Sequence, residues 1–340
     1  MPDDPSLSET EAKVAFLKQP ASYPEQPNRV EALETHMSWL FFTDRYVYKL
    51  KKPLRYEFLD FSTVAARQRN CQDEVRLNRR LSQDVYLGTV PLTVDAECNM
   101  QLGGDGPVID WLVKMRRLPS DQGLDRRIKS HTVSAEDIIN LALILAEFYK
   151  KAPPVAIGAS EYREQFEKDV ETTLRELTTP GLGLSIAWIK QIATAQLEFL
   201  KDRAALFEAR VQEGSIIEGH GDLRPEHIYI GPEPAIIDCL EFNRDLRILD
   251  PADELAFLAM ECERLDAPFV KTVLFNTYRR ITSDNPPAEL VHFYMSYRAS
   301  LWAKLAIRHL NRQGTGARSK WINRANAYLQ LADDHIRKAQ

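Results

Sequence analysis

The densest group of side chains that could do chemistry lies between residues 215 and 241, in the run SIIEGHGDLRPEHIYIGPEPAIIDCLE. Short apolar stretches on either side of the turn Gly231–Pro234 predict a β-hairpin. If its strands pair symmetrically about that turn, His227 lies opposite Asp238, with Cβ atoms about 5 Å apart. An imidazole and a carboxylate at that spacing could hold one metal ion together.

A glycine-flanked loop precedes the hairpin. Gly219 and Gly221 stand on either side of His220, so the chain can turn sharply there and present Asp222 beside the predicted cation. A carboxylate next to a divalent ion suits general-base or nucleophile-orienting work in phosphoryl transfer, which depends mostly on positioning and charge neutralisation. Arg224 could supply a cation for the migrating phosphoryl group.

The elements that must position these groups fall into two parts. Up to Leu118, the pattern predicts a small antiparallel sheet carrying one helix, and residues 119–340 are mainly helical apart from the hairpin. A first helix from Ser8 to about Leu17 is expected to be an appendage, within residues 1–29. The predicted strands lie at 30–33, 38–42, 45–52, 89–94 and 108–115, and the predicted helix at 63–81.

On these residues the chain resembles the aminoglycoside phosphotransferase and choline kinase group of the protein-kinase-like fold. HGDLRPEH is similar to that group's catalytic loop, whose pattern is H-x-D-x-x-x-x-N, and IIDCLEF is similar to its metal-binding Asp segment. The resemblance covers roughly residues 30 to 310 and is closest to uncharacterised bacterial aminoglycoside phosphotransferase family proteins. It implies a two-lobed α+β fold with a small antiparallel-sheet N-lobe, which binds nucleotide, and a mainly helical C-lobe.

The resemblance also implies roles. Asp222 would be the catalytic base toward a substrate hydroxyl, His220 would buttress the loop, and Asp238 would be the main ligand of Mg²⁺ bound to ATP. Position 227 would be the second metal ligand, but it is His where the pattern has Asn. Mg²⁺ prefers oxygen ligands, whereas imidazole suits softer metals. Three outcomes are open: a preference for Mn²⁺, a site in which Asp238 does most of the metal binding, or a weakened catalyst.

A lysine-bearing strand is expected on the nucleotide side. In RYVYKLKK, a period of two puts Val47, Lys49 and Lys51 on one face. Lys49, with Val47 two residues before it, resembles the V-A-I-K strand in which the lysine holds the α- and β-phosphates, and Lys51 is the second choice. A lysine in a cleft needs a carboxylate partner, and Glu74 is favoured over Asp73 because it shares the apolar face of its helix.

Two further segments complete the predicted nucleotide site. The run ETHMS stands where a kinase has its Gly-rich phosphate cover, and it contains no glycine. Backbone amides approach phosphates best where no side chain blocks them. We therefore expect phosphate binding by this segment to be weaker, or to use the side chains of Thr35, His36 and Ser38. By resemblance and chain order, Met115 offers backbone groups to adenine.

The segment DPADELAF predicts a helix start. Asp250 before Pro251 suits an N-cap, and Asp253 and Glu254 follow in the first turn, where negative charge is favourable. We expect structural roles for all three acids.

Together these features predict an ATP-dependent phosphotransferase that acts on the hydroxyl of an aminoglycoside-, choline- or sugar-like molecule. Nine acidic and three basic residues between Asp238 and Asp266 would attract a cationic or polyhydroxylated acceptor, or they serve the metal site and solvated helix faces. Two alternatives stay open. A nucleotide-binding pseudokinase with a sensing or scaffolding role is favoured by the missing glycines and by His227. A metal-dependent hydrolase would use His220, Asp222, His227 and Asp238 as ligands.

Composition excludes several other classes. With 340 residues, 44% hydrophobic residues and a net charge of −5, the chain is globular and has no general nucleic-acid-binding charge. The acidic start has no apolar signal core, and no apolar run is long enough for a membrane span. We therefore expect a cytoplasmic protein without nucleic-acid or membrane partners.

Overall fold

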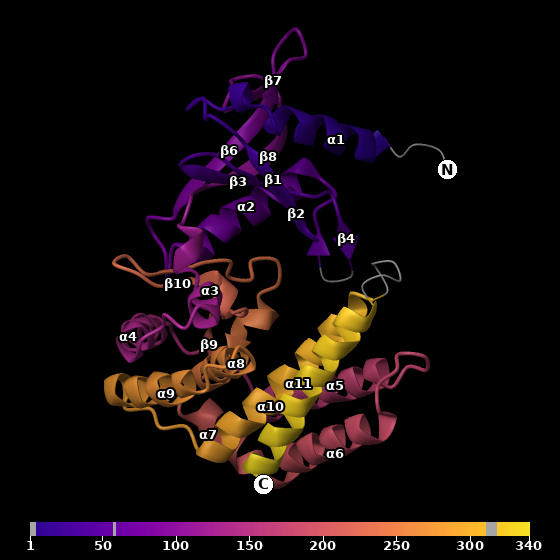
Figure 1. The fold of residues 1–340 in the computed structure, drawn as a ribbon, viewed down its shortest axis with the longest axis vertical. Coiled ribbons are helices and arrows are strands. Elements are labelled where there is room, and N and C mark those ends of the chain that lie inside the picture. The colour runs from indigo at the N-terminus through magenta and orange to yellow at the C-terminus, as the bar shows by residue number, and fades with distance from the viewer. Residues whose placement is uncertain (1–4, 57–58, 311–317) are drawn as a thin grey trace. The chain divides into compact units, whose positions relative to one another are not determined.

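The computed structural model describes residues 5–56, 59–310 and 318–340, which form two compact units (Figure 1). The first unit combines residues 1–122 with 233–245, and the second combines 123–232 with 246–340. The segment 233–245, which the sequence analysis grouped with the helical part, therefore makes its contacts with the first unit. The first four residues of the predicted appendage lie outside the described residues.

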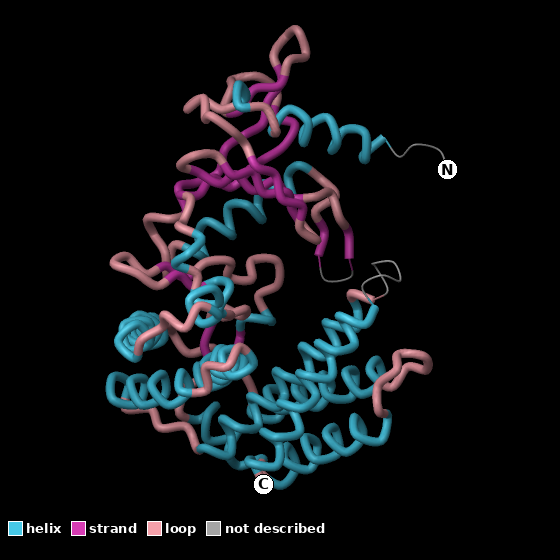
Figure 2. Tube along the Cα trace, viewed as in Figure 1, coloured by secondary structure: helices cyan, strands magenta, loops and turns pink. Residues whose placement is uncertain are grey.

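The core of the first unit is a six-stranded antiparallel sheet (Figure 2), with the strand order β1-β2-β3-β8-β6-β7. Five of its strands were predicted, whereas β7 is too short to show an alternating pattern. The bounds are β1 (Glu31–Glu34), β2 (Ser38–Phe42), β3 (Tyr46–Lys51), β6 (Tyr86–Val94), β7 (Met100–Leu102) and β8 (Val108–Arg116). Shorter strands in this unit are β4 (Arg55–Tyr56), β5 (Leu59–Asp60) and β11 (Ala235–Ile236).

One face of β3 packs against the start of the chain. Tyr48 and Leu50 join Leu17 and Tyr23 in a buried apolar cluster. The helix α1 (Pro5–Leu17) is therefore part of the core of this unit rather than an appendage. After α1, the short 3₁₀ turn η1 (Pro20–Ser22) is followed by Tyr23, which is buried in the same cluster.

The other face of β3 carries the lysines and meets α2 (Val64–Asn78). This helix starts at Thr63, whose side chain accepts a hydrogen bond from the amide of Ala66. It buries charged groups as well as apolar ones: the guanidinium of Arg67 binds both carboxylate oxygens of Asp110 at 2.8 and 2.9 Å. Lys13 of α1 donates to the same carboxylate at 3.0 Å, so one buried ion network joins both helices to β8.

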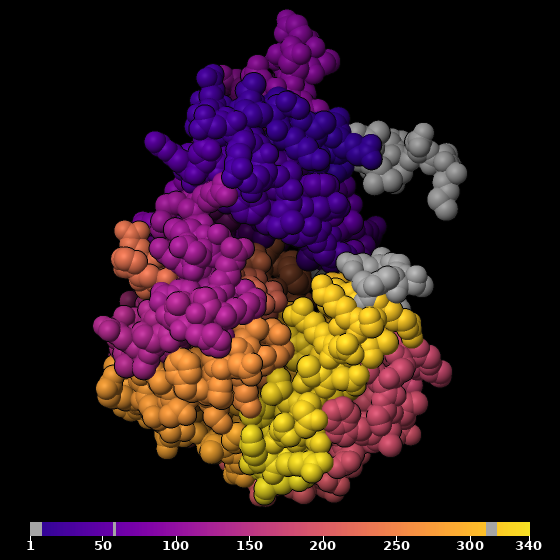
Figure 3. All heavy atoms as spheres, in the orientation of Figure 1, coloured from indigo at the N-terminus to yellow at the C-terminus, as the bar shows by residue number. Residues whose placement is uncertain are grey.

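The second unit is mainly helical, and its central helix is α8, in which every residue from Pro251 to Cys262 is buried. The C-terminal helix α11 runs along α10, its main packing partner (Figure 1), and its residues form the yellow surface in Figure 3. Two separate helices, α6 and α7, follow α5, because the chain leaves the helical conformation at Arg203. The helices are α3 (Leu124–Lys129), α4 (Ala135–Lys151), α5 (Ala159–Leu177), α6 (Ile186–Asp202), α7 (Ala204–Gln212), α8 (Pro251–Arg264), α9 (Phe269–Thr282), α10 (Ala288–Arg308) and α11 (Arg318–Ala339).

Short elements carry the loops of the second unit. The strands β9 (Ile217–Glu218) and β12 (Ile248–Leu249) pair antiparallel beside the glycine-flanked loop. The 3₁₀ turn η3 (Pro225–His227) leads into β10 (Ile228–Tyr229). None of the described helices is both long and apolar enough to cross a membrane. The predicted α+β class, with a small antiparallel sheet and a helical remainder, is confirmed.

Replacing Leu17 with Ala should destabilise the first unit by about 2–5 kcal/mol, because removing fully buried methyl groups leaves a cavity in the cluster under β3. The matched control is Leu33→Ala in β1, whose side chain is 52% exposed and should change the free energy of unfolding by less than about 0.5 kcal/mol. Urea denaturation followed by tryptophan fluorescence measures both changes. Equal midpoints for the two variants would show that α1 is dispensable.

Candidate functional site

The first unit holds a row of alternating charges that is buried except at Asp238. The ammonium of Lys49 lies 2.9 Å from Oε1 of Glu74 and 2.9 Å from Oδ1 of Asp238. Lys51 binds the other oxygen of Glu74 and also Glu241. The predicted pairing of Lys49 with Glu74 is therefore present. The second pair through Lys51 was not predicted, because it depends on which late segment returns to the sheet.

The attraction between these ammonium and carboxylate groups offsets the cost of burying them. Burial lowers the pKa of Lys49, but Asp238 and Glu74 raise it more, so that its pKa lies well above the ordinary value. Burial raises the pKa of Glu74, and Lys49 and Lys51 reverse this effect, so that its pKa is lowered. For Glu241, burial outweighs the attraction of Lys51 and the pKa is raised. Glu74, held between two cations, is thus stabilised in its ionised form despite its burial.

Asp238 is held by a short segment with an unusual backbone. Its φ is +63°, in the left-handed region that an aspartate tolerates better than most residues. Its amide donates to the hydroxyl of Tyr86 at 3.1 Å, and the next amide donates to Oδ1 of Asn78 at 2.9 Å. Two residues earlier, the hydroxyl of Ser82 bonds both backbone groups of Ile236. The side chains of Asn78, Ser82 and Tyr86 therefore fix the backbone that carries Asp238.

The other predicted nucleotide residues also lie in the first unit. Val47 and Met115 are buried and directly opposite each other in the register of β3 and β8. Thr35 closes the glycine-free turn between β1 and β2: its hydroxyl donates to the carbonyl of Ser38 and accepts from the amide of Ser38. The ring of His36 lies against that of Tyr56. The Thr35 hydroxyl is thus already used by the turn.

In the second unit, a buried carboxylate holds the glycine-flanked loop. Glu254 of α8 accepts hydrogen bonds from the amides of His220, at 2.9 Å, and Gly221, at 2.6 Å. The hydroxyl of Tyr149 donates to the same carboxylate at 2.9 Å. Gly221 has a φ of +88°, and a side chain on Gly219 would meet the Glu254 oxygens at about 3 Å. Both glycines are therefore needed for the loop to approach Glu254 so closely.

The loop brings Asp222, Arg224 and His227 together. The amide of Asp222 donates to Nδ1 of His220 at 3.3 Å. His227 lies 2.9 Å from the carbonyl of Asp222 through Nδ1 and 3.0 Å from Nη2 of Arg224 through Nε2. A guanidinium can only donate, so Nε2 accepts, and Nδ1 carries the proton and donates to the carbonyl.

Besides His227, Arg224 contacts Asp222 and Trp302. Its Nε lies 3.0 Å from Oδ1 of Asp222, close enough for charge pairing but without hydrogen-bond alignment. Its guanidinium lies 4.6 Å from the ring centre of Trp302. Burial lowers the pKa of Arg224, but Asp222 and nearby glutamates raise it more, so the net pKa is raised. Arg224 therefore remains a cation beside the Asp222 carboxylate.

The predicted sharing of one ion by His227 and Asp238 stays a prediction, because the two residues belong to different units. Within the described ranges, no three His, Cys, Asp or Glu side chains converge as a metal ion requires. The four ligands of the hydrolase alternative are likewise divided between the two units, so this alternative also stays a prediction.

The acidic stretch that suggested a cationic acceptor is largely structural. As expected, Asp250 caps α8, and its carboxylate also binds Arg210 at 2.7 and 2.8 Å. Asp253 binds Arg298, and Glu254 holds the loop. These three acids are buried and bind groups of the protein itself, so their charges contribute little to the attraction of a cationic substrate.

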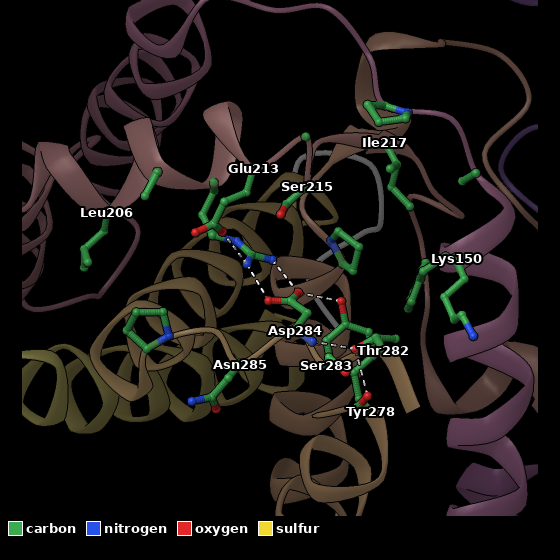
Figure 4. A pocket seen from close by; sticks show the side chains of 18 residues that line it. Lys150, Leu206, Glu213, Ser215, Ile217, Tyr278, Thr282, Ser283, Asp284 and Asn285 are labelled. Carbon is green, nitrogen blue, oxygen red and sulfur yellow. Dashed lines mark hydrogen bonds and ion pairs between the residues drawn. The ribbon is translucent and has the colours of Figure 1, made fainter. Parts of the chain in front are cut away.

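A cavity of about 740 Å³ lies in the second unit away from the predicted residues, none of which lines it (Figure 4). Its wall includes Arg210, which binds both oxygens of Asp284 at 2.6 and 2.7 Å. Tyr278 donates to Asp284 as well. Tyr149 and Ile217 also border the cavity, so it lies behind the strand and the helix that support the loop.

Replacing Glu74 with Gln should destabilise the protein by about 3 kcal/mol, because two buried ammonium groups lose the carboxylate between them and keep one partner each. The control is Asp73→Asn, one residue earlier on α2, which removes only an exposed pair with Arg76 and should cost less than about 1 kcal/mol. Denaturant unfolding at neutral pH measures both. Similar losses in the two variants would contradict the role given to Glu74.

The pH dependence of the same pair of proteins gives a second measurement. Because the pKa of Glu74 is lowered on folding, its contribution is complete above the ordinary value of 4.5 and disappears as the pH falls through the lower folded value. The stability gap between the parent protein and Glu74→Gln should therefore close only below pH 4.5. A gap that closes at higher pH would mean that Glu74 is not ionised in the folded state.

No protein-family profile matches the chain. The uncharacterized proteins MT2060 and Rv2004c of Mycobacterium tuberculosis and Mb2027c of Mycobacterium bovis are each 31% identical to it over 320 residues. These matches cover 91% of this chain and 60% of each relative, so the chain spans about 60% of the length of the curated relatives it matches.

Several solved structures are similar along almost the whole chain. A choline/ethanolamine kinase family protein from Mesorhizobium loti has a TM-score of 0.56 at 14% identity, over 96% of this chain and 98% of that one. Choline kinase from Cryptosporidium parvum Iowa II has a TM-score of 0.53 at 10% identity, over 96% and 97%. A thermostable mutant of aminoglycoside phosphotransferase APH(4)-Ia has a TM-score of 0.53 at 12% identity, over 92% and 94%.

At 10 to 14% identity, these similarities concern the fold. The same fold was expected from the similarity of HGDLRPEH and IIDCLEF to the catalytic loop and the metal-binding segment of this group. The chain has the two-lobed, protein-kinase-like α+β fold of choline kinases and aminoglycoside phosphotransferases.

Proposed function

We propose that this chain transfers the γ-phosphate of ATP to the hydroxyl of a small molecule. The observation that carries the proposal is the ion pair of Lys49 with Glu74, with Asp238 held 2.9 Å from the same ammonium. Phosphoryl transfer needs a fixed cation for the phosphates and a carboxylate for the metal that accompanies them. A strand lysine oriented by a helix glutamate supplies the first, and Asp238 supplies the second.

The donor set at Asp238 suits a hard cation. Its carboxylate is 44% exposed, unlike the buried carboxylates of Glu74 and Glu241, and the left-handed backbone fixes its direction. Oxygen ligands of this kind are those that Mg²⁺ prefers. When bound with ATP, Mg²⁺ neutralises the charge of the phosphates. Lys49 and Glu74 hold their positions without it.

The loop of the second unit is suited to act on the acceptor. In the proposed step, the acceptor hydroxyl oxygen bonds to the γ-phosphorus, the bond to the β–γ bridging oxygen breaks, and Asp222 takes the hydroxyl proton. Arg224, which lies beside Asp222, supplies positive charge for the transferred group. Glu254 keeps the loop backbone in place, so that Asp222 need not be repositioned during the reaction.

A nucleotide-binding pseudokinase is the second candidate. The turn between β1 and β2 contains no glycine, and its Thr35 hydroxyl is used to close the turn. His227 accepts from Arg224 through Nε2, so metal binding there requires Arg224 to leave. Such a protein would bind ATP and turn none of it over.

The Asp222→Asn and Asp238→Asn variants separate these functions. Asp222→Asn should keep ATP-dependent thermal stabilisation and lower transfer to a panel of hydroxyl acceptors by about a hundredfold or more, since it loses the proton acceptor. Asp238→Asn should lose the metal-dependent part of the stabilisation. ADP formation and melting curves are the measurements. Stabilisation of the parent protein by ATP without ADP formation with any acceptor would favour the pseudokinase.

His227→Asn tests the metal assignment with a binding readout. An asparagine amide can donate to the Asp222 carbonyl as Nδ1 does, and it replaces the imidazole acceptor with a harder oxygen. The Mg²⁺ concentration that half-saturates ATP-dependent stabilisation should fall relative to that for Mn²⁺. An unchanged ratio of the two concentrations would remove position 227 from the metal site.

A further inference from the structure

Two histidines outside the proposed site meet in the second unit. His292 of α10 and His335 of α11 lie with their Nδ1 atoms 2.8 Å apart. His335 is fully buried, and its Nε2 lies 3.1 Å from Oε2 of Glu263, near the end of α8. Three helices therefore bring one carboxylate and two imidazoles into a single row, in the order Glu263, His335, His292.

The row determines which nitrogen carries each proton when both rings are neutral. The hydrogen bond from His335 lowers the pKa of Glu263, so this carboxylate is ionised and accepts from Nε2 of His335. Nδ1 of His335 is then an acceptor, and Nδ1 of His292 must be the donor between the two rings. Nε2 of His292 is therefore left with its lone pair.

That lone pair can be reached from solvent. The side chain of His292 is half-buried, and no residue that the structure describes makes a hydrogen bond with its Nε2. Nε2 is also not among the described side-chain atoms that are both closed to solvent and without a partner. An imidazole that is oriented through one nitrogen and open at the other is the arrangement in which histidine acts as a base or a nucleophile.

The surroundings keep His292 neutral and attract anions. Burial, followed by the positive charge of Lys271, lowers the pKa of His292 to about 4, and Lys338 acts in the same direction. A neutral imidazole has the lone pair that a nucleophile needs. Lys271 of α9 and Lys338 of α11 form no ion pair with any residue in the described ranges, so their charges remain available to an anion.

We propose that His292 is a phosphorylation site, at which Nε2 takes the phosphoryl group of a small acyl phosphate. The lone pair of Nε2 forms the bond to phosphorus, the bond from phosphorus to the carboxylate oxygen breaks, and the carboxylate leaves with that electron pair. The proton on Nδ1 passes to Nδ1 of His335, whose positive charge is then paired with Glu263. An acyl phosphate fits because its leaving group needs no proton and because the two lysines attract its phosphate.

Acetyl phosphate is the probe, and it is incubated with the full chain at pH 8 without nucleotide. Peptide mapping by mass spectrometry should show His292 phosphorylated at least about tenfold faster than His131, an exposed histidine of the same chain. The rate at His292 should saturate as the acetyl phosphate concentration rises. Phosphorus NMR should identify the product as the Nε2 isomer, because Nδ1 is occupied by the hydrogen bond to His335.

Two substitutions of His335 distinguish positioning of the ring from packing. His335→Phe removes the acceptor for the Nδ1 proton, so the rate at His292 should fall by about tenfold or more and the Nδ1 isomer should appear. In His335→Gln, the amide carbonyl can accept that proton's hydrogen bond. This variant should restore the Nε2 isomer as the sole product, with a rate between those of the parent protein and His335→Phe. The rate at His131 is the internal reference in every sample.

The lysines are tested through the concentration dependence. Lys271→Gln should raise the acetyl phosphate concentration that gives half of the maximal rate by about threefold or more, because an attractive charge is lost. The control is Lys168→Gln on α5, whose ammonium forms only an exposed pair with Glu164 at 3.6 Å, and it should change that concentration by less than about 1.5-fold.

The proposal is overturned if His292 reacts no faster than His131, if its product is the Nδ1 isomer, or if His335→Gln is as slow as His335→Phe. Acetylation of Lys271 or Lys338 in place of phosphorylation of His292 would also overturn it. Since no nucleotide is present and none of these residues belongs to the site proposed for phosphotransfer, the result does not depend on that function.

Discussion

The carboxylate of Glu74, placed between two buried ammonium groups, is the constraint on which the first unit depends. Each lysine in β3 would be too costly to bury alone, and each is acceptable because an acid from α2 reaches it. The strand, the helix and the returning segment with Asp238 and Glu241 are therefore joined by charge as much as by apolar contact. A site for polyphosphate can be built on such a network, because its cations are already fixed before any substrate arrives.

In the second unit, a buried acid likewise fixes the groups around it. The element that it positions is a loop, and the groups that it binds are backbone amides rather than side-chain cations. Glu254 accepts hydrogen bonds from the amides of His220 and Gly221, and Tyr149 of α4 donates a further hydrogen bond to the same carboxylate. Burial raises the pKa of Glu254, and these hydrogen bonds favour its ionised form. The position of Asp222 thus depends on the buried hydrogen bonds that the two residues before it make to Glu254.

Local patterns in the sequence were enough to predict five strands of the main sheet, the helix α2 and the Lys49–Glu74 pair, because periodicity alone assigns each residue to a face. Patterns could not show which distant segments meet. That Ser82, Asn78 and Tyr86 hold residues 236–239, and that Lys51 has Glu241 as a second partner, follow from contacts across more than 150 positions. The core role of α1 was missed for the same reason: nothing in its own sequence identifies the sheet as its partner.

The first unit is assembled from two stretches of chain separated by more than a hundred residues of the other unit. During synthesis, its sheet can form early, but Lys51 must wait for Glu241, and Lys49 for Asp238, until the segment that carries these two acids has left the ribosome. Closure of the charge chain is then a late event in folding, and it comes only after the intervening segment has been made.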